Sequence, residues 1–230
     1  MHTCEVDAPL HRVRCDDDDV SVPGGLAAHL RNLTAPEWQR ALSHPLLEQV
    51  ASGTVPMEVF EQFVLINTHF LRTYRRFMMV MGTIAPDVRS SKLMFANFQS
   101  VDHEIADGEE FAERHGLGRP LPSARAMDYT SFVMACSGQG WVRGLIVTYA
   151  VESLFYECWA TVSADAPAAS ELLEFVDTWS GSYQADNVKA LRALVDPLPL
   201  TSDIERTYRS VLRSEIAGWD EAFAATGRMS

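Results

Sequence analysis

The chain has 230 residues, and 47% of them are hydrophobic, which is enough for a sizeable folded core. The formal net charge is -12 and no basic run is present, which argues against nucleic acid or an anionic membrane as a partner. No uncharged apolar stretch is long enough to span a bilayer, and no apolar leader begins the chain. We therefore expect a cytoplasmic protein whose partner is a small molecule.

Residues 1–24 are predicted to form a disordered acidic tail. They include four consecutive aspartates, Asp16 to Asp19, and end at Pro23 and Gly24. Like charges repel one another, and this stretch has little apolar surface to bury. Residues 25–230 are expected to form a single all-α domain, because no window alternates between apolar and polar residues as a strand would.

Helical periodicity predicts the elements of this domain in chain order. Near the start, Thr34 followed by Pro36 and Glu37 is typical of a helix N-terminus with a capping box. The predicted helices span residues 26–33, 34–42, 44–53, 57–82, 87–115, 124–136, 140–163, 168–179, 183–195 and 201–225.

The predicted helix at 140–163 is apolar on every side, which is typical of a helix at the centre of a bundle. Glu152 is an acidic residue near the middle of this apolar helix. Tyr149, Phe155 and Tyr156 lie three or four positions from Glu152 and therefore on or near its face. A carboxylate in such surroundings must be paired, protonated or used in chemistry.

A second acid, Glu215 in the last helix, has Val211 and Trp219 at helical spacing and is therefore predicted to face inward. The helix at 57–82 contributes Asn67 within an aromatic face, and the helix at 124–136 contributes Tyr129. Two inward carboxylates with an aromatic lining suit a small, flat ligand that is cationic or carries an amine.

Structural roles remain open for the same residues. The acids can be neutralised by arginines, the aromatic side chains can be ordinary core packing, and Asn67 can satisfy a backbone group. The arginines placed to neutralise Glu152 or Glu104 are Arg72, Arg75, Arg76 and Arg143. Cys136 and Cys158 fall in apolar helical contexts and are expected to be reduced and buried.

Several segments, in order, resemble the TenA family of thiaminase II and aminopyrimidine aminohydrolases. The resemblance runs from about His44 to Phe223, and it implies the heme-oxygenase-like all-α fold, no cofactor, and a homo-oligomer that is a dimer or a tetramer. The matching segments are HPLLEQVASGTVPMEVFEQFVLINTHFL from His44, the E-x6-F-A pattern of Glu104–Ala112, the block Tyr129–Phe132, AVESLFYECW from Ala150, and SEIAGWDEAF ending at Phe223.

Carried over residue by residue, the resemblance implies that Glu215 is the catalytic glutamate. Asn67 occupies the position of an aspartate that binds the aminopyrimidine. Val151 falls where the thiaminase II subclass has its nucleophilic cysteine, so the chain is more similar to the subclass that lacks this cysteine and uses a glutamate, with Glu152 beside the vacant position. The aromatic residues expected to line the substrate pocket are Phe70, Tyr129, Tyr149, Phe155, Tyr156 and Trp179.

The expected function is metal-independent hydrolysis of a C–N bond in a small aminopyrimidine-type metabolite, with Glu215 and Glu152 as general acid and base. One alternative is a binding or diverged biosynthetic protein that keeps the pocket without aminohydrolase activity. A second is an iron oxidase or a heme protein, for which His29 or His44 could supply a proximal ligand. All seven histidines lie at or before His115, so the central and last helices contain none, which disfavours a di-iron site.

Overall fold

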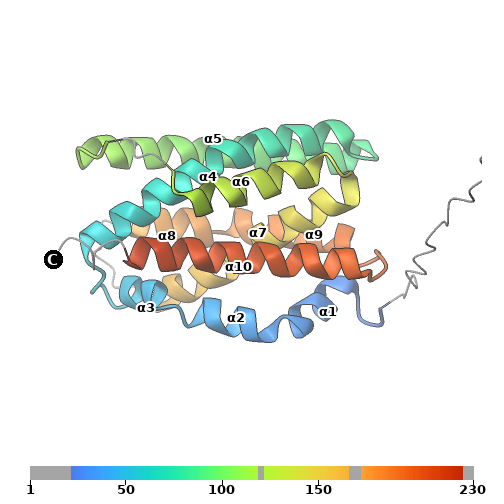
Figure 1. Ribbon diagram of the computed structural model, residues 1–230, viewed down its shortest axis with the longest axis horizontal. Coiled ribbons are helices and arrows are strands. Elements are labelled where there is room, and N and C mark those ends of the chain that lie inside the picture. Colours follow the sequence, from blue (N-terminus) through green and yellow to red (C-terminus); the bar gives the residue numbers. More distant parts are fainter. Residues whose placement is uncertain (1–21, 119–121, 166–171, 225–230) are drawn as a thin grey trace, which may run out of the picture.

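The computed structural model describes residues 22–118, 122–165 and 172–224, which form ten α-helices and no β-strand (Figure 1). The all-α prediction is therefore confirmed. The helices are α1 (Leu26–Leu33), α2 (Ala35–Leu42), α3 (Pro45–Ala51), α4 (Met57–Ile84), α5 (Val88–Arg114), α6 (Ala124–Ser137), α7 (Trp141–Asp165), α8 (Leu173–Ser180), α9 (Ser182–Val195) and α10 (Ser202–Ala224).

The arrangement of the helices can be followed in Figure 1. The short helices α1–α3 line one edge of the molecule, α5 lies along the opposite edge, and α10 runs between them. The long helices α4 and α5 pack against each other along their length. α7 contacts α2, α3, α4, α6, α8, α9 and α10, so the prediction that the apolar helix occupies the centre is confirmed.

The core forms around α7 because this helix has no polar face. Leu145, Ile146, Ala150 and Leu154 are fully buried, as is Trp159. Trp159 belongs to a cluster of aromatic rings that joins α4, α5, α7 and α8. The other members of the cluster are Phe60, Phe63, Phe111, Phe155, Phe175 and Trp179. Burial of each such side chain contributes roughly 1.5–3 kcal/mol, and edge-to-face ring contacts add to this.

Side chains define where several helices begin. Asp87 accepts a hydrogen bond from the backbone N–H of Ser90 (2.8 Å) at the start of α5. His44 caps α3, because its Nδ1 accepts from the N–H of Leu46 (3.2 Å). The other ring nitrogen of His44, Nε2, therefore carries the hydrogen and donates to Asp220 Oδ1 (3.3 Å), which ties α3 to α10.

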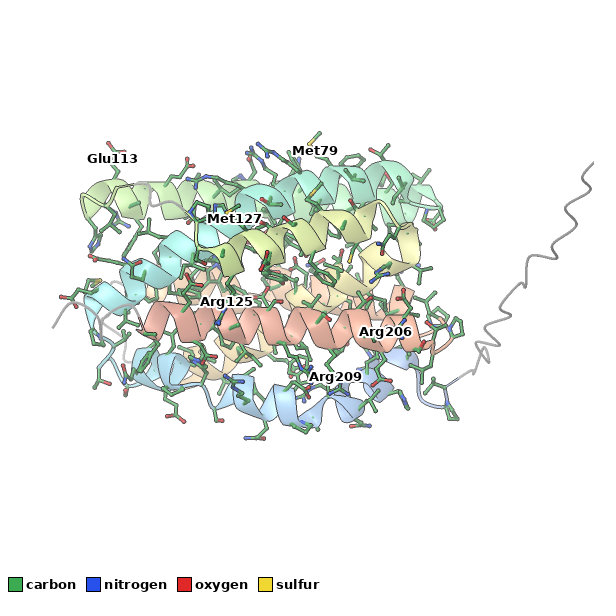
Figure 2. All side chains as sticks on the ribbon, viewed as in Figure 1. Met79, Glu113, Arg125, Met127, Arg206 and Arg209 are labelled. Carbon is green, nitrogen blue, oxygen red and sulfur yellow. The ribbon has the colours of Figure 1, made fainter. Side chains whose placement is uncertain are left out.

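The capping box predicted at Thr34 is wrong. Thr34 is the residue before α2, but its hydroxyl donates back to the carbonyl of Leu30 (2.7 Å) and caps no amide of α2. Glu37 is engaged elsewhere: its Oε1 accepts from Arg209 (2.6 Å) and Arg213 (3.2 Å) of α10. Figure 2 shows Arg209 on the side of α10 that faces the short N-terminal helices. Tertiary ion pairing has replaced the local hydrogen bond that the pattern suggested.

The other helix boundaries agree with the predicted ones to within a few residues. The acidic tail, apart from its last three residues, lies outside the described residues, and so do the predicted start of the helix at 168 and the predicted end of the last helix at 225. Among the described helices, none combines the length and the apolar composition that crossing a membrane requires.

Gly108 allows α5 to approach α4 closely, and this leads to a stability prediction. A Cβ atom at position 108 would lie 2.2 Å from Oγ1 of Thr68, which itself donates to the carbonyl of Val64 (2.7 Å). We expect Gly108→Ala to lower the free energy of unfolding by about 1–2 kcal/mol, because overpacking outweighs the gain in helix propensity. Urea denaturation measures the change.

The matched control is Gly138→Ala. At Gly138 a Cβ would meet only the carbonyl oxygen of Ala135, at an ordinary 3.5 Å, so the free energy of unfolding should change by less than about 0.5 kcal/mol. Equal stability of the two variants would contradict the argument that Gly108 is needed for helix contact.

Candidate functional site

A small cavity lies where α4, α5, α7, α9 and α10 meet. Its volume is about 20 Å³, which is room for roughly one water molecule. Three carboxyl groups reach it from three different helices, those of Glu104, Glu152 and Glu215. The remaining lining residues are Asn67, Phe70, Leu71, Tyr74, Val101, Val151, Phe155 and Gln184. The cavity thus brings together acids that are far apart in the sequence.

Glu152 is held by two hydrogen bonds. Its Oε1 accepts from the hydroxyl of Tyr74 on α4 (2.9 Å), and its Oε2 accepts from the side-chain amide of Asn187 on α9 (3.1 Å). Burial raises the pKa of Glu152 to about 7, and the two donors limit that rise because they favour the charged form. Near neutral pH this carboxyl can therefore either accept or release a proton.

Glu215 has a similar pKa but fewer donors. Its Oε1 accepts from the hydroxyl of Tyr129 on α6 (2.5 Å). Burial raises its pKa to about 7, the hydrogen bond from Tyr129 lowers it, and the nearby Glu152 raises it further. Burial also holds the pKa of Tyr74 and of Tyr129 well above 10, so both phenols remain hydrogen-bond donors.

Glu104, on α5, is the third acid of the cavity. Burial raises its pKa to about 8, and repulsion from Glu152 contributes to the rise. Its Oε1 also accepts a long hydrogen bond from Ser100 (3.4 Å). At neutral pH this carboxyl is mostly protonated and can donate a hydrogen bond into the cavity.

Three of the four arginines considered as partners of these acids bind other carboxylates. Arg143 pairs with Asp203 (3.2 Å), Arg72 with Glu109 (2.7 Å) and Arg75 with Asp102 (2.5 Å). No ion pair among the described residues involves Glu104, Glu152 or Glu215. These partly buried carboxyls have raised pKa values and no cationic partner, which is typical of a functional site.

Most of the residues predicted for the site do meet there. Asn67, Phe70 and Phe155 line the cavity together with Glu152 and Glu215. Tyr129, the hydrogen-bond donor to Glu215, stacks on Phe70 with ring centroids 4.9 Å apart and an interplanar angle of 7°.

Three predicted aromatic residues are absent from the cavity lining, although one of them, Trp179, forms a side-chain hydrogen bond with Glu104. Tyr149 packs against Tyr208 (6.2 Å between centroids), and Trp179 lies in the aromatic cluster, 5.3 Å from Phe155. Neither of them, nor the partly buried Tyr156, is among the lining residues. Helical spacing from Glu152 predicted Tyr149 and Tyr156, and the family resemblance implied Trp179. Tyr149 packs instead against a ring of α10.

The structure adds residues that the sequence did not single out for the site. Tyr74 and Asn187 bind Glu152 directly, and Gln184 lines the cavity. The sequence of α9 did contain a signal, because Gln184, Asn187 and Leu191 recur at helical spacing. In the structure all three are buried. A buried amide within an apolar stripe needs a polar partner, but the sequence could not say which one.

A larger cleft of about 770 Å³ lies between α4, α5 and α6. It contains none of the predicted site residues. Its lining includes Gly118 and Pro122, which flank a short segment that the structure does not describe. We place the candidate site in the smaller cavity because its three carboxyls have raised pKa values and form no ion pair with a described residue. In the described part of the chain, no three His, Cys, Asp or Glu side chains are arranged to hold a metal ion.

The fold and the cavity define an all-α protein with an acidic and aromatic site between its helices. The model of the TENA/THI-4/PQQC family matches residues 32–216, and the chain belongs to this family. The resemblance inferred from the sequence motifs is confirmed at this level.

Individual relatives are more distant. The chain is 26% identical over 107 residues to the aminopyrimidine aminohydrolase of Bacillus subtilis (strain 168), an alignment that covers 44% of this chain and 45% of that relative. The chain thus spans about half the length of the curated relative it matches. Its fold is similar to that of a TenA homologue from Pyrococcus furiosus, with a TM-score of 0.78, 22% identity, and coverage of 85% of this chain and 98% of that one.

A putative TenA-like thiaminase from Sulfolobus solfataricus P2 has a TM-score of 0.75 and 15% identity, and the alignment covers 87% of this chain and 97% of that chain. At these identities the solved structures establish the shared fold.

Proposed function

We propose that this protein hydrolyses a C–N bond in a small aminopyrimidine-type metabolite, of the kind handled in thiamin salvage, without a metal ion. The observation that carries the proposal is one cavity in which two of the three lining carboxyls, those of Glu152 and Glu215, each accept a hydrogen bond from a tyrosine hydroxyl. Membership of the family and similarity to an aminopyrimidine aminohydrolase support it.

The lining suits a flat heterocycle with amino substituents. Phe70 and Phe155 offer aromatic surfaces, and Asn67 can supply one acceptor and one donor to an aminopyrimidine edge. Asn67 lacks the charge that an aspartate would bring, so a shifted substrate preference is part of the proposal. Because the ligand-free cavity holds about one water molecule, binding a ring requires lining side chains to move.

Hydrolysis needs one group to take a proton from water and another to give a proton to the leaving nitrogen. Glu152 and Glu215, each with a pKa of about 7, are suited to these roles near neutral pH. A covalent route through cysteine is not proposed: Val151 occupies the expected cysteine position, and Cys136 and Cys158 are buried thiols away from the cavity lining.

The test is release of ammonia or formate from aminomethyl- and formylaminomethyl-pyrimidines, measured together with the metal content of the purified protein. We expect product formation that a chelator does not reduce. Stoichiometric iron or heme, with activity lost on its removal, would contradict the proposal. Ligand binding without turnover would instead favour the pocket-containing binding protein.

A further inference from the structure

A pair of buried asparagines stands directly behind Glu152. Asn97 of α5 is 1% exposed and Asn187 of α9 is 4% exposed. Their side-chain amides bond reciprocally: Nδ2 of Asn187 donates to Oδ1 of Asn97 (2.7 Å), and Nδ2 of Asn97 donates to Oδ1 of Asn187 (2.9 Å). The second hydrogen of each amide nitrogen is also used. That of Asn97 goes to the carbonyl of Leu93 (2.9 Å), and that of Asn187 goes to Glu152 Oε2 (3.1 Å).

The carbonyl of Leu93 determines which atom donates and which accepts in each hydrogen bond of this network. The backbone carbonyl of Leu93 can only accept, so it requires Nδ2 of Asn97 beside it and therefore turns Oδ1 of Asn97 toward Asn187. That oxygen in turn requires an amide nitrogen from Asn187. The remaining N–H of Asn187 must then point at Glu152, and an N–H can only donate.

As a consequence, Oε2 of Glu152 must accept the hydrogen bond from Asn187. Protonation at Oε2 would oppose two hydrogens and leave the buried amide of Asn187 unsatisfied, which is costly. Each acid also receives a tyrosine hydroxyl, Tyr74 at Glu152 and Tyr129 at Glu215, and a hydroxyl can donate or accept. The N–H of Asn187 is the additional donor that favours the charged form of Glu152. The two acids therefore differ in their donors although both have a pKa of about 7.

We propose that Asn187, clamped by Asn97, is a positioning residue that fixes Glu152 as the proton acceptor of the reaction and leaves Glu215 as the proton donor. This inference rests on the proposed hydrolase function. Glu152 removes a proton from water as the water oxygen forms the new C–O bond. Glu215 transfers its proton to the nitrogen as the C–N bond breaks. Water thus adds across the C–N bond, and a proton passed from Glu152 to Glu215 through solvent restores both groups.

Other groups that can titrate face Glu152 from the surrounding helices, and the test must separate them. These groups are Tyr74 on α4, Glu104 on α5, Tyr183 on α9 and Glu215 on α10. Titration of the ligand-free protein labelled with ¹³C at the glutamate carboxyls resolves the acids individually, with signals assigned by their loss in Glu152→Gln, Glu215→Gln and Glu104→Gln.

In the wild type we expect Glu152 to ionise at a lower pH than Glu215. In Asn187→Leu, the midpoint for Glu152 should rise by about one pH unit or more, the effect of losing one hydrogen bond to a charged group. The acidic limb of the pH–kcat profile should move by the same amount, with little change in KM, because Asn187 does not line the cavity. Thr148→Val, which removes a buried hydroxyl of α7 that donates only to the carbonyl of Gly144 (3.0 Å) and does not line the cavity, should leave the Glu152 midpoint in place.

The double variant Asn97→Leu/Asn187→Leu removes both partners and guards against misfolding of the single variant. An unchanged midpoint for Glu152 in either variant, or a wild type in which Glu215 ionises first, would overturn the assignment. A wild type without turnover would overturn the proposed function instead. The order of ionisation, which needs no substrate, would still decide whether the asparagine pair holds Glu152 as the acceptor.

Discussion

Glu215→Gln is expected to reduce kcat by about 10³-fold or more while leaving the fold intact. Glutamine has nearly the same shape and can still accept the hydrogen bond from Tyr129, but it cannot transfer a proton. General acid–base catalysis by one side chain typically contributes about 10²–10⁴-fold, and the leaving nitrogen depends on this proton. The measurement is the rate of ammonia release at saturating substrate, together with thermal unfolding of both proteins.

The control for this prediction is Glu205→Gln, which removes a carboxylate from the same helix. Glu205 is partly exposed and pairs with Arg209 (3.3 Å), a contact worth little in solvent. We expect its kcat to remain within about twofold of the wild type, since surface changes of this size rarely affect chemistry. Activity retained in Glu215→Gln would remove this residue from the mechanism.

The stability of the protein is expected to fall as the pH rises from about 5 to about 8. Burial raises the pKa of Glu152 and Glu215 from 4.5 to about 7 and that of Glu104 from 4.5 to about 8. The folded protein therefore binds these protons more tightly than the unfolded chain does. This stabilising contribution is fully present below about pH 4.5 and is lost as the pH passes through the folded-state values.

Comparison of variants isolates this contribution from groups such as His44, whose pKa is lowered by burial and which therefore acts in the opposite direction. One pKa unit corresponds to about 1.4 kcal/mol, and the carboxyls are partly exposed to the cavity, so we expect a partial effect. Glu152→Gln should be more stable than the wild type by about 1–2 kcal/mol at pH 8, with a smaller difference at pH 5. Urea denaturation at both pH values measures this, and a pH-independent difference would contradict it.

If the loss of activity and the pH dependence of stability are both observed, the carboxyls of the site support activity and lower stability. The site keeps three carboxyls away from cations, which lowers stability at neutral pH. The same arrangement provides groups that exchange protons near pH 7. Replacing either Glu152 or Glu215 by glutamine should therefore raise stability at neutral pH and remove a group that exchanges protons.

Local patterns predicted the helices well because each one carries its own periodic signal. The helix at 140–163 was recognisable as central since it lacks a polar face, and α7 does occupy the centre of the bundle. The capping box at Thr34 failed for the opposite reason. Its residues fit the local pattern, but Glu37 gains more from two arginines of α10 than from a backbone amide.

The sequence by itself determined the helical architecture, the family, and the inward placement of Glu152 and Glu215, because helical spacing and motif order are properties of neighbouring residues. Only the tertiary structure decided which groups bind those acids. Tyr74 reaches Glu152 from 78 positions away, Tyr129 reaches Glu215 from 86, and Asn97 and Asn187 are 90 positions apart. Hydrogen bonds of this kind depend on which helices pack together, and the periodicity within one helix does not identify its neighbours.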